Sequence, residues 1–182
     1  MCDYCGCRNQ PEINELSEEH DRLLDLAYEL RQLARRGSHA EVLELVDGEF
    51  ASLLDHHTDK EEQGLFTQLR SCFAADDRLD TLIGEHREIG VLVTTVRAGE
   101  DGWRDVLTQL VDDLDHHILD EEVDLFPYAM YELRGSQWAR ISEVHAASTR
   151  IGTRRAGCTG HLAGDAQGRR SRPASVPSGS SA

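Results

Sequence analysis

The sequence lacks any long hydrophobic run. None of its stretches approaches the roughly 18 to 20 consecutive apolar residues of a membrane-spanning helix. Its first residues, MCDYCGCRNQ, lack the basic and then apolar pattern of a secretory signal. The chain has 182 residues, of which 39% are hydrophobic, and this is enough to bury one sizeable core. We therefore expect a soluble, cytoplasmic protein without a membrane partner.

Basic residues are also scarce. Lysine and arginine number 19 against 34 aspartates and glutamates, which gives a formal net charge of −15. Such a surface repels a phosphate backbone, so a nucleic-acid partner is not expected. Cations are the more natural partners, and the composition does not define an oligomeric state.

No segment alternates between polar and apolar residues with period two, so no strand is expected. Clusters of glycine, proline and serine instead separate long segments of helical periodicity. The predicted helices span residues 11–35, 38–73, 77–97 and 103–133, with a shorter fifth helix at 136–151. Short joints between long amphipathic helices favour antiparallel neighbours, so the sequence predicts an all-α protein, an up-down four-helix bundle.

Composition divides the chain into three parts. Residues 1–10 form a cysteine-rich segment, and residues 11–151 hold the predicted bundle with its fifth helix. Residues 152–182 are rich in glycine, serine, proline and arginine. They contain too few apolar groups to offset the entropy of ordering them, so we expect a disordered tail there.

One phrase is written twice. LDHHTDKEEQGLF at residues 54–66 returns as LDHHILDEEVDLFP at residues 114–127. Because residues three, four and seven apart share a helix face, the second histidine and first glutamate of each copy lie with the leucines. The first histidine of each copy, His56 or His116, lies on a polar face and is predicted to point outward.

The other two helices each send one histidine to their apolar face by the same test. The rise of about 1.5 Å per residue brings these inward side chains to one level of the bundle. The inward set consists of His20, His57, Glu61, His86, His117 and Glu121.

This set favours a metal centre. A lone inward histidine is more often an ordinary hydrogen-bonded core residue, but two ionised glutamates in an apolar core need a cation between them. Several protonated imidazoles would repel one another. Six nitrogen and oxygen ligands are too many for a closed tetrahedral zinc site and suit iron or manganese. The doubled unit suggests two metals, one per helical hairpin, with both glutamates as bridges.

The order His, His-x-x-x-Glu, His, His-x-x-x-Glu, with the surrounding EHDRLL and EEVDLFP, resembles the hemerythrin-like (HHE cation-binding) family over about residues 14 to 133. The resemblance implies a four-helix bundle with two iron ions, joined by the two carboxylates and an oxo or hydroxo bridge. Manganese or zinc are less expected. It also implies dioxygen binding, reaction with peroxide or nitric oxide, or iron handling.

The oxygen-carrying members have a second histidine one turn after the third-helix ligand, where this chain has Gly90. The resemblance then implies a vacancy, filled by water or by an oxygen donor such as Glu62 or Glu122, that is open to a small ligand. We expect a di-iron protein that reacts with or senses dioxygen, peroxide or nitric oxide. An oxidoreductase, a redox sensor without turnover and an iron donor for damaged iron centres, each with or without a protein redox partner, stay open.

Three further groups of residues have candidate roles. Cys2, Cys5 and Cys7 form C-x-x-C-x-C, for which a second metal site, redox exchange and a silent terminus stay open; cysteines of a cytoplasmic chain are expected to be thiols or ligands. Asp55 or Asp115 could accept a hydrogen bond from a ligating imidazole. Candidate tyrosines for contact with a bound ligand are Tyr28, Tyr128 and Tyr131.

Overall fold

The computed structural model describes residues 6–72 and 77–158, with side chains up to residue 148, and this part of the chain is helical without a strand. A short 3₁₀ helix, η1 (Cys7–Asn9), precedes α1 (Pro11–Arg36). Pro11 lies in the first turn of α1, where its missing N–H costs no hydrogen bond. The prediction of an all-α protein is confirmed.

The second helical run is continuous and changes its pitch twice. Ser38 caps it, because its side chain accepts from the Glu41 amide while the Glu41 carboxylate accepts from the Ser38 amide. Two π-helical segments interrupt the α-helix. The elements are α2 (His39–Leu45), η2 (Val46–Phe50), α3 (Ala51–Lys60), η3 (Glu61–Phe66) and α4 (Thr67–Cys72).

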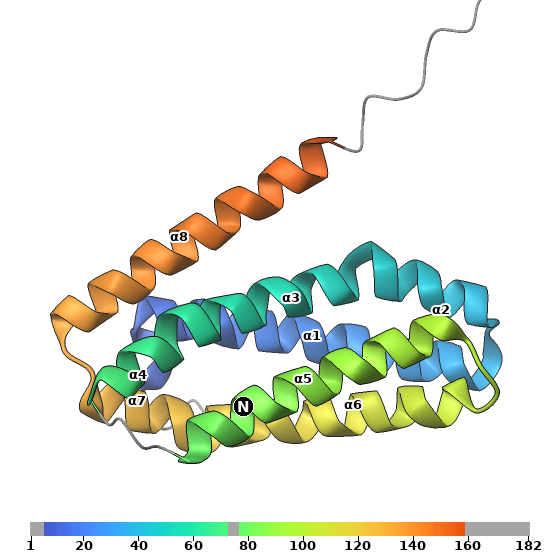
Figure 1. The fold of residues 1–182 in the computed structure, drawn as a ribbon, viewed down its shortest axis with the longest axis horizontal. Coiled ribbons are helices and arrows are strands. Elements are labelled where there is room, and N and C mark those ends of the chain that lie inside the picture. The colour runs from blue at the N-terminus through green and yellow to red at the C-terminus, as the bar shows by residue number, and fades with distance from the viewer. Residues whose placement is uncertain (1–5, 73–76, 159–182) are drawn as a thin grey trace, which may run out of the picture.

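The second hairpin repeats this plan. The elements are α5 (Asp77–Ala98), α6 (Trp103–Asp120), the π segment η4 (Glu121–Leu125) and α7 (Phe126–Glu132). Figure 1 shows the four helical runs side by side. The structure thus has the predicted up-down arrangement, and each long run contributes one wall to the interior.

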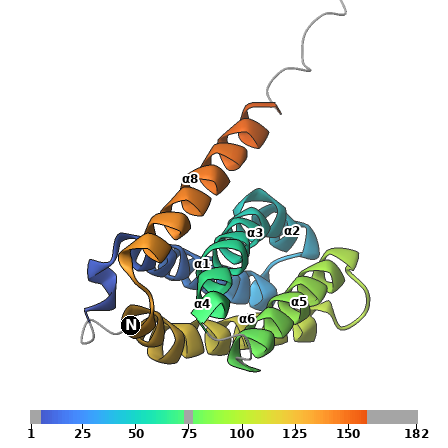
Figure 2. The ribbon, with the colours of Figure 1, turned by 60° about the vertical axis from the view of Figure 1, so that its left-hand side comes forward.

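The last helix, α8 (Gly135–Cys158), lies outside the bundle and contacts α1, α3, η3 and α4. Its C-terminal end projects away from the other helices in both views (Figures 1 and 2). Trp138 and Ile141 are its buried apolar side chains. The helix runs past the predicted end at residue 151, since one mid-helix glycine, Gly152, costs only about 1 kcal/mol. Most of the predicted tail, residues 159–182, lies outside the described residues.

Two apolar clusters fill the bundle, one on each side of a polar middle. One contains Leu23 and Trp103, and the other contains Ile13 and Phe66. His20 lies between them along α1. These layers keep water away from the polar middle from both ends of the bundle. No helix among the described residues is long and apolar enough to cross a membrane.

Candidate metal centre

The structure brings the six predicted side chains together in the polar middle. His20 comes from α1, His57 from α3 and His86 from α5, and each has at most 8% of its surface exposed. His117 comes from α6, and the glutamates begin the π segments η3 and η4. Glu61 and Glu121 are both fully buried. The outward histidines behave differently: His116 is exposed and His56 is half-buried.

The cluster divides into two groups that share both glutamates. Donor atoms of His20 and His57 lie within 4.8 Å of one another and of Glu61 and Glu121, and the same holds for the second histidine pair. The ring centroids are 4.5 Å apart in the pair His20 and His57, and 4.6 Å apart in the other pair, His86 and His117. The arrangement agrees with one metal position per hairpin and two glutamates between them.

The donor atoms of the cluster fit a metal pair. Among the described residues, the Nε2 atoms of all four histidines and both carboxylate oxygens of both glutamates are buried without a hydrogen-bond partner. His20 Nε2 approaches Glu121 Oε2 to 3.2 Å without hydrogen-bonding geometry. Because an unsatisfied buried polar atom is costly, so many at one place fit a bound cation. Their role as metal ligands stays a prediction.

Every one of the four imidazoles also contacts a carboxylate through its other ring nitrogen. In the first pair, His20 Nδ1 lies 3.0 Å from Glu122 Oε1 and His57 Nδ1 lies 3.1 Å from Glu19 Oε2. A carboxylate at Nδ1 favours the tautomer that donates there, so Nε2 keeps its lone pair for a metal.

The second pair has matching contacts. His86 Nδ1 lies 2.9 Å from Glu62 Oε1, and His117 Nδ1 lies 2.8 Å from Glu85 Oε2. In both hairpins, one such carboxylate directly precedes the first inward histidine and the other directly follows the inward glutamate. This adjacency is the sequence signal that could have found them.

These contacts change two expectations. Asp55 and Asp115 are exposed, and among the described contacts neither accepts from an inward imidazole, so the prediction of either as the acceptor is wrong. Glu62 and Glu122 contact Nδ1 atoms in this structure and do not fill a position beside Gly90. Gly90 lies on the exposed side of α5, where an added Cβ would meet no other atom within 4 Å.

The π segments rotate the last residues of each repeated sequence relative to a regular α-helix. η3 and η4 start at the two inward glutamates, Glu61 and Glu121, and π segments recur at functional sites. Phe126, which follows η4, stacks on His20 at 5.5 Å, and Phe66, at the end of η3, stacks on His86 at 5.7 Å. Each phrase thus supplies a phenyl ring over the imidazole of the opposite hairpin and shields it from water.

In the metal-free protein, the pKa values of the buried glutamates and histidines are shifted in opposite directions. Burial, followed by repulsion from Glu121, raises the pKa of Glu61 well above its usual value. Burial opposes the charge of Glu121 too, but His117 and His20 outweigh it and lower its pKa to about 2. Burial disfavours the charge of His20, yet Glu121 and Glu122 raise its pKa to about 10. Burial and the charge of His20 lower the pKa of His57 to about 4.

A chain of charged contacts leads from the centre to α8. Lys60 is buried and donates to Glu15, at 2.6 Å, and to Glu19, which holds His57. Glu15 in turn lies 2.9 Å from Nδ1 of the buried His145 on α8. This contact joins residues that are far apart in the chain, so the periodicity of a single helix does not reveal it.

Two of the three candidate tyrosines are largely exposed. Tyr28 is 65% exposed and Tyr131 is 77% exposed. Tyr128 lies under the guanidinium of Arg78, at 4.1 Å from ring centroid to Cζ. None of the described contacts links these tyrosines to the six inward side chains, so the structure gives no support to the ligand contact suggested for them.

The cysteine segment is described only in part. Cys7 is buried and disulfide-bonded, so the expectation of thiols or ligands is wrong for this residue. Cys2 and Cys5 lie outside the described residues. Cys72 is exposed and accepts a hydrogen bond from Gln137 Nε2 at 3.0 Å. The redox or metal role predicted for the segment stays a prediction.

Fold and site together define the class of this protein: a helical bundle whose four helical runs each send ligand-type side chains into one buried cation-binding cluster. The family model described as "Hemerythrin HHE cation binding domain" matches residues 12–129. The chain belongs to this family. Comparison with curated proteins and with solved structures gives no match.

Proposed function

We propose that this protein holds two iron ions in the centre and reacts there with dioxygen, peroxide or nitric oxide, or senses them. One observation carries the metal part: the buried Nε2 and carboxylate oxygen atoms that converge without hydrogen bonds. Mixed imidazole and carboxylate donors suit iron better than zinc. The cytoplasmic setting and a protein redox partner are part of the same proposal.

The side chains of the cluster have different roles in this proposal. His20 and His57 would hold one ion, His86 and His117 the other, and the glutamates would span both. Bound iron supplies the redox change and a coordination position for a small ligand. The carboxylates at the Nδ1 atoms fix the imidazole tautomers, which keeps the four Nε2 atoms directed at the ions.

Redox sensing without turnover is a second candidate, favoured by one contact. Arg8 follows the disulfide-bonded Cys7 directly and places Nη2 3.8 Å from Oε1 of Glu122. Glu122 contacts His20. Reduction of the disulfide would therefore act on a residue one step away from the proposed ligands.

The test uses iron content and absorption spectra of the full chain, beside two matched variants. We expect two irons per wild-type chain, at most one in His57→Ala and an unchanged content in His56→Ala, because only His57 belongs to the buried cluster. Repeated consumption of added peroxide or nitric oxide would identify an enzyme, and a single stoichiometric spectral change would identify a sensor. Equal losses in both variants, or no stoichiometric iron in the wild type, would contradict the proposal.

A further inference from the structure

The two metal positions have unequal surroundings. We define the closed half as His20 and His57 with the carboxylates at their Nδ1 atoms, Glu122 and Glu19. The open half is His86 and His117 with Glu62 and Glu85. The contacts within the halves are alike, at 2.8 to 3.1 Å from nitrogen to oxygen. The difference lies in what surrounds the carboxylates.

In the closed half, both carboxylates are shielded and face cations. The Glu19 side chain is 17% exposed and pairs with the buried Lys60. The Glu122 side chain is 7% exposed and lies 3.8 Å from Arg8. α8 lies against α1 and α3, which carry the two histidines. An ion in this half would have to pass ion pairs and a helix before it met water.

In the open half, both carboxylates reach solvent. The Glu62 side chain is 39% exposed and that of Glu85 is 33% exposed. Among the ion pairs that the structure describes, these two glutamates pair with histidines and with no lysine or arginine. Their negative charge is therefore less compensated than that of Glu19 and Glu122.

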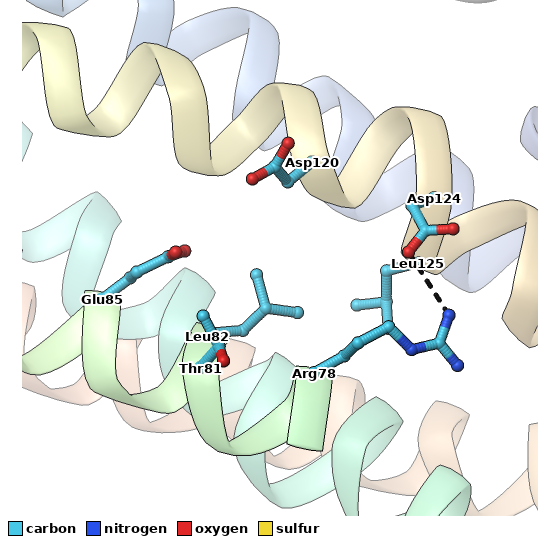
Figure 3. Close-up of a pocket in the computed structure, with 7 residues that line it drawn as sticks. All are labelled: Arg78, Thr81, Leu82, Glu85, Asp120, Asp124 and Leu125. Atoms are coloured by element: carbon cyan, nitrogen blue, oxygen red, sulfur yellow. Dashed lines mark hydrogen bonds and ion pairs between the residues drawn. The ribbon is translucent and has the colours of Figure 1, made fainter. Parts of the chain in front are cut away.

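Two cavities along α5 and α6 share Glu85 in their lining, and the first also borders η4. The first, of about 290 Å³, is lined by Glu85, Asp120 and Asp124 beside apolar Leu82 and Leu125. Figure 3 shows Arg78 reaching Asp124 at one end, while the carboxylates of Glu85 and Asp120 face the space between the helices.

The second cavity, of about 350 Å³, lies along the same pair of helices. Its lining includes Glu85, Glu88, Asp113 and the buried residue His117. One of the proposed ligand residues thus borders a cavity. Acidic walls of this kind concentrate cations and repel anions.

From these contrasts we propose that the cavities along α5 and α6 form the route by which a divalent cation reaches the centre, and that the ion held by His86 and His117 exchanges with solvent while its partner is retained. Glu85 is the carboxylate that joins the route to His117. The inference rests on the proposed function, since it requires two bound ions.

The first experiment follows iron loss from the full, iron(II)-loaded chain to a chromogenic ferrous chelator without oxygen. We expect two phases of equal amplitude that differ in rate by about tenfold or more. His117→Ala should keep only the slow phase and His57→Ala only the fast phase. A reversed assignment, or two bound irons that leave at one rate, would overturn the inference. A wild-type chain without stoichiometric iron would contradict the proposed function itself.

The second experiment tests the route without touching a ligand. The double variant Asp113→Asn with Asp120→Asn removes one carboxylate from each cavity. Its iron(II) uptake should be about tenfold slower at low salt, as electrostatic steering predicts, with two irons still bound at the end. The control is Asp25→Asn with Glu29→Gln, which removes the same charge from the exposed face of α1. Equal uptake rates in the two double variants would overturn the route.

Discussion

At the residue scale, helical period alone located the inward histidines and glutamates. It could not locate the carboxylates at Nδ1. Glu19 and Glu85 directly precede inward histidines, so the period places them about 100° away from the inward face. Each accepts a hydrogen bond from a histidine of the neighbouring helical run: Glu19 from His57, and Glu85 from His117. Which helix lies beside which is a tertiary fact that the face of one helix does not contain.

Lys60 provides a residue-scale prediction. Its ammonium is buried between two carboxylates, so Lys60→Met leaves Glu15 and Glu19 without their cation. Breaking a buried pair costs about 3 to 5 kcal/mol, and we expect about 2 to 3 kcal/mol here because the Glu15 side chain is 40% exposed. Urea unfolding of the metal-free protein measures it.

An exposed ion pair of the same bundle is the matched control for Lys60. Arg97 pairs with Asp47 at 2.7 Å, and both side chains are largely exposed. Arg97→Met should lower the free energy of unfolding by at most about 0.5 kcal/mol. A similar loss in both variants would show that the Lys60 contacts add nothing beyond a surface pair.

At the element scale, the periodicity placed the four helical runs and missed the π segments. A π segment inserts a residue without ending the helix, so the apolar pattern continues on a rotated face. The residues after Glu61 and Glu121 show the consequence, because Phe66 and Phe126 reach imidazoles of the opposite hairpin. The end of α8 was missed for another reason: Gly152 weakens a helix without stopping it.

The effect of replacing Pro127 on stability distinguishes a π segment from a regular α-helix at this point of the chain. A proline inside a regular α-helix removes a backbone hydrogen bond and bends the helix. Pro127 instead lies in the first turn of α7, just after the π segment η4. Because the hydrogen bonds of a π segment already shift from the i−4 to the i−5 acceptor, the missing N–H costs less there than in a regular helix. Pro127→Ala should therefore change the free energy of unfolding by less than about 1 kcal/mol. A gain of about 3 kcal/mol in urea unfolding would place the proline inside a regular helix.

At the scale of the whole molecule, the two hairpins provide a near-symmetric centre and the segments outside them make it unequal. The repeated phrases supply matching histidines, glutamates and phenyl rings. Among the described residues, η1 and α8 have no counterpart beside the second histidine pair. They bring Arg8 to Glu122, which contacts His20, and His145 to Glu15 of α1. The sequence showed the repeat but not this difference, because the packing of α8 is decided by long-range contacts.

The balance of protons in the whole centre gives the last prediction: the stabilisation that a bound metal confers should increase as the pH rises from about 7 to about 8.5. The metal-free fold favours the proton on His20, whose pKa is about 10, and the raised pKa of Glu61 acts in the same direction. A raised folded-state pKa contributes stability that is lost as the pH rises, so the metal-free protein weakens over this interval.

Metal binding displaces these protons and becomes easier as they leave. The lowered pKa values of Glu121, about 2, and His57, about 4, act mainly below this interval and leave its sign unchanged. Calorimetry of the metal-free and the manganese(II)-loaded chain at each pH measures the difference in Tm, which should widen as the pH rises. A constant or narrowing difference would show that His20 has already released its proton in the metal-free fold, and that Glu121 and Glu122 do not hold it there.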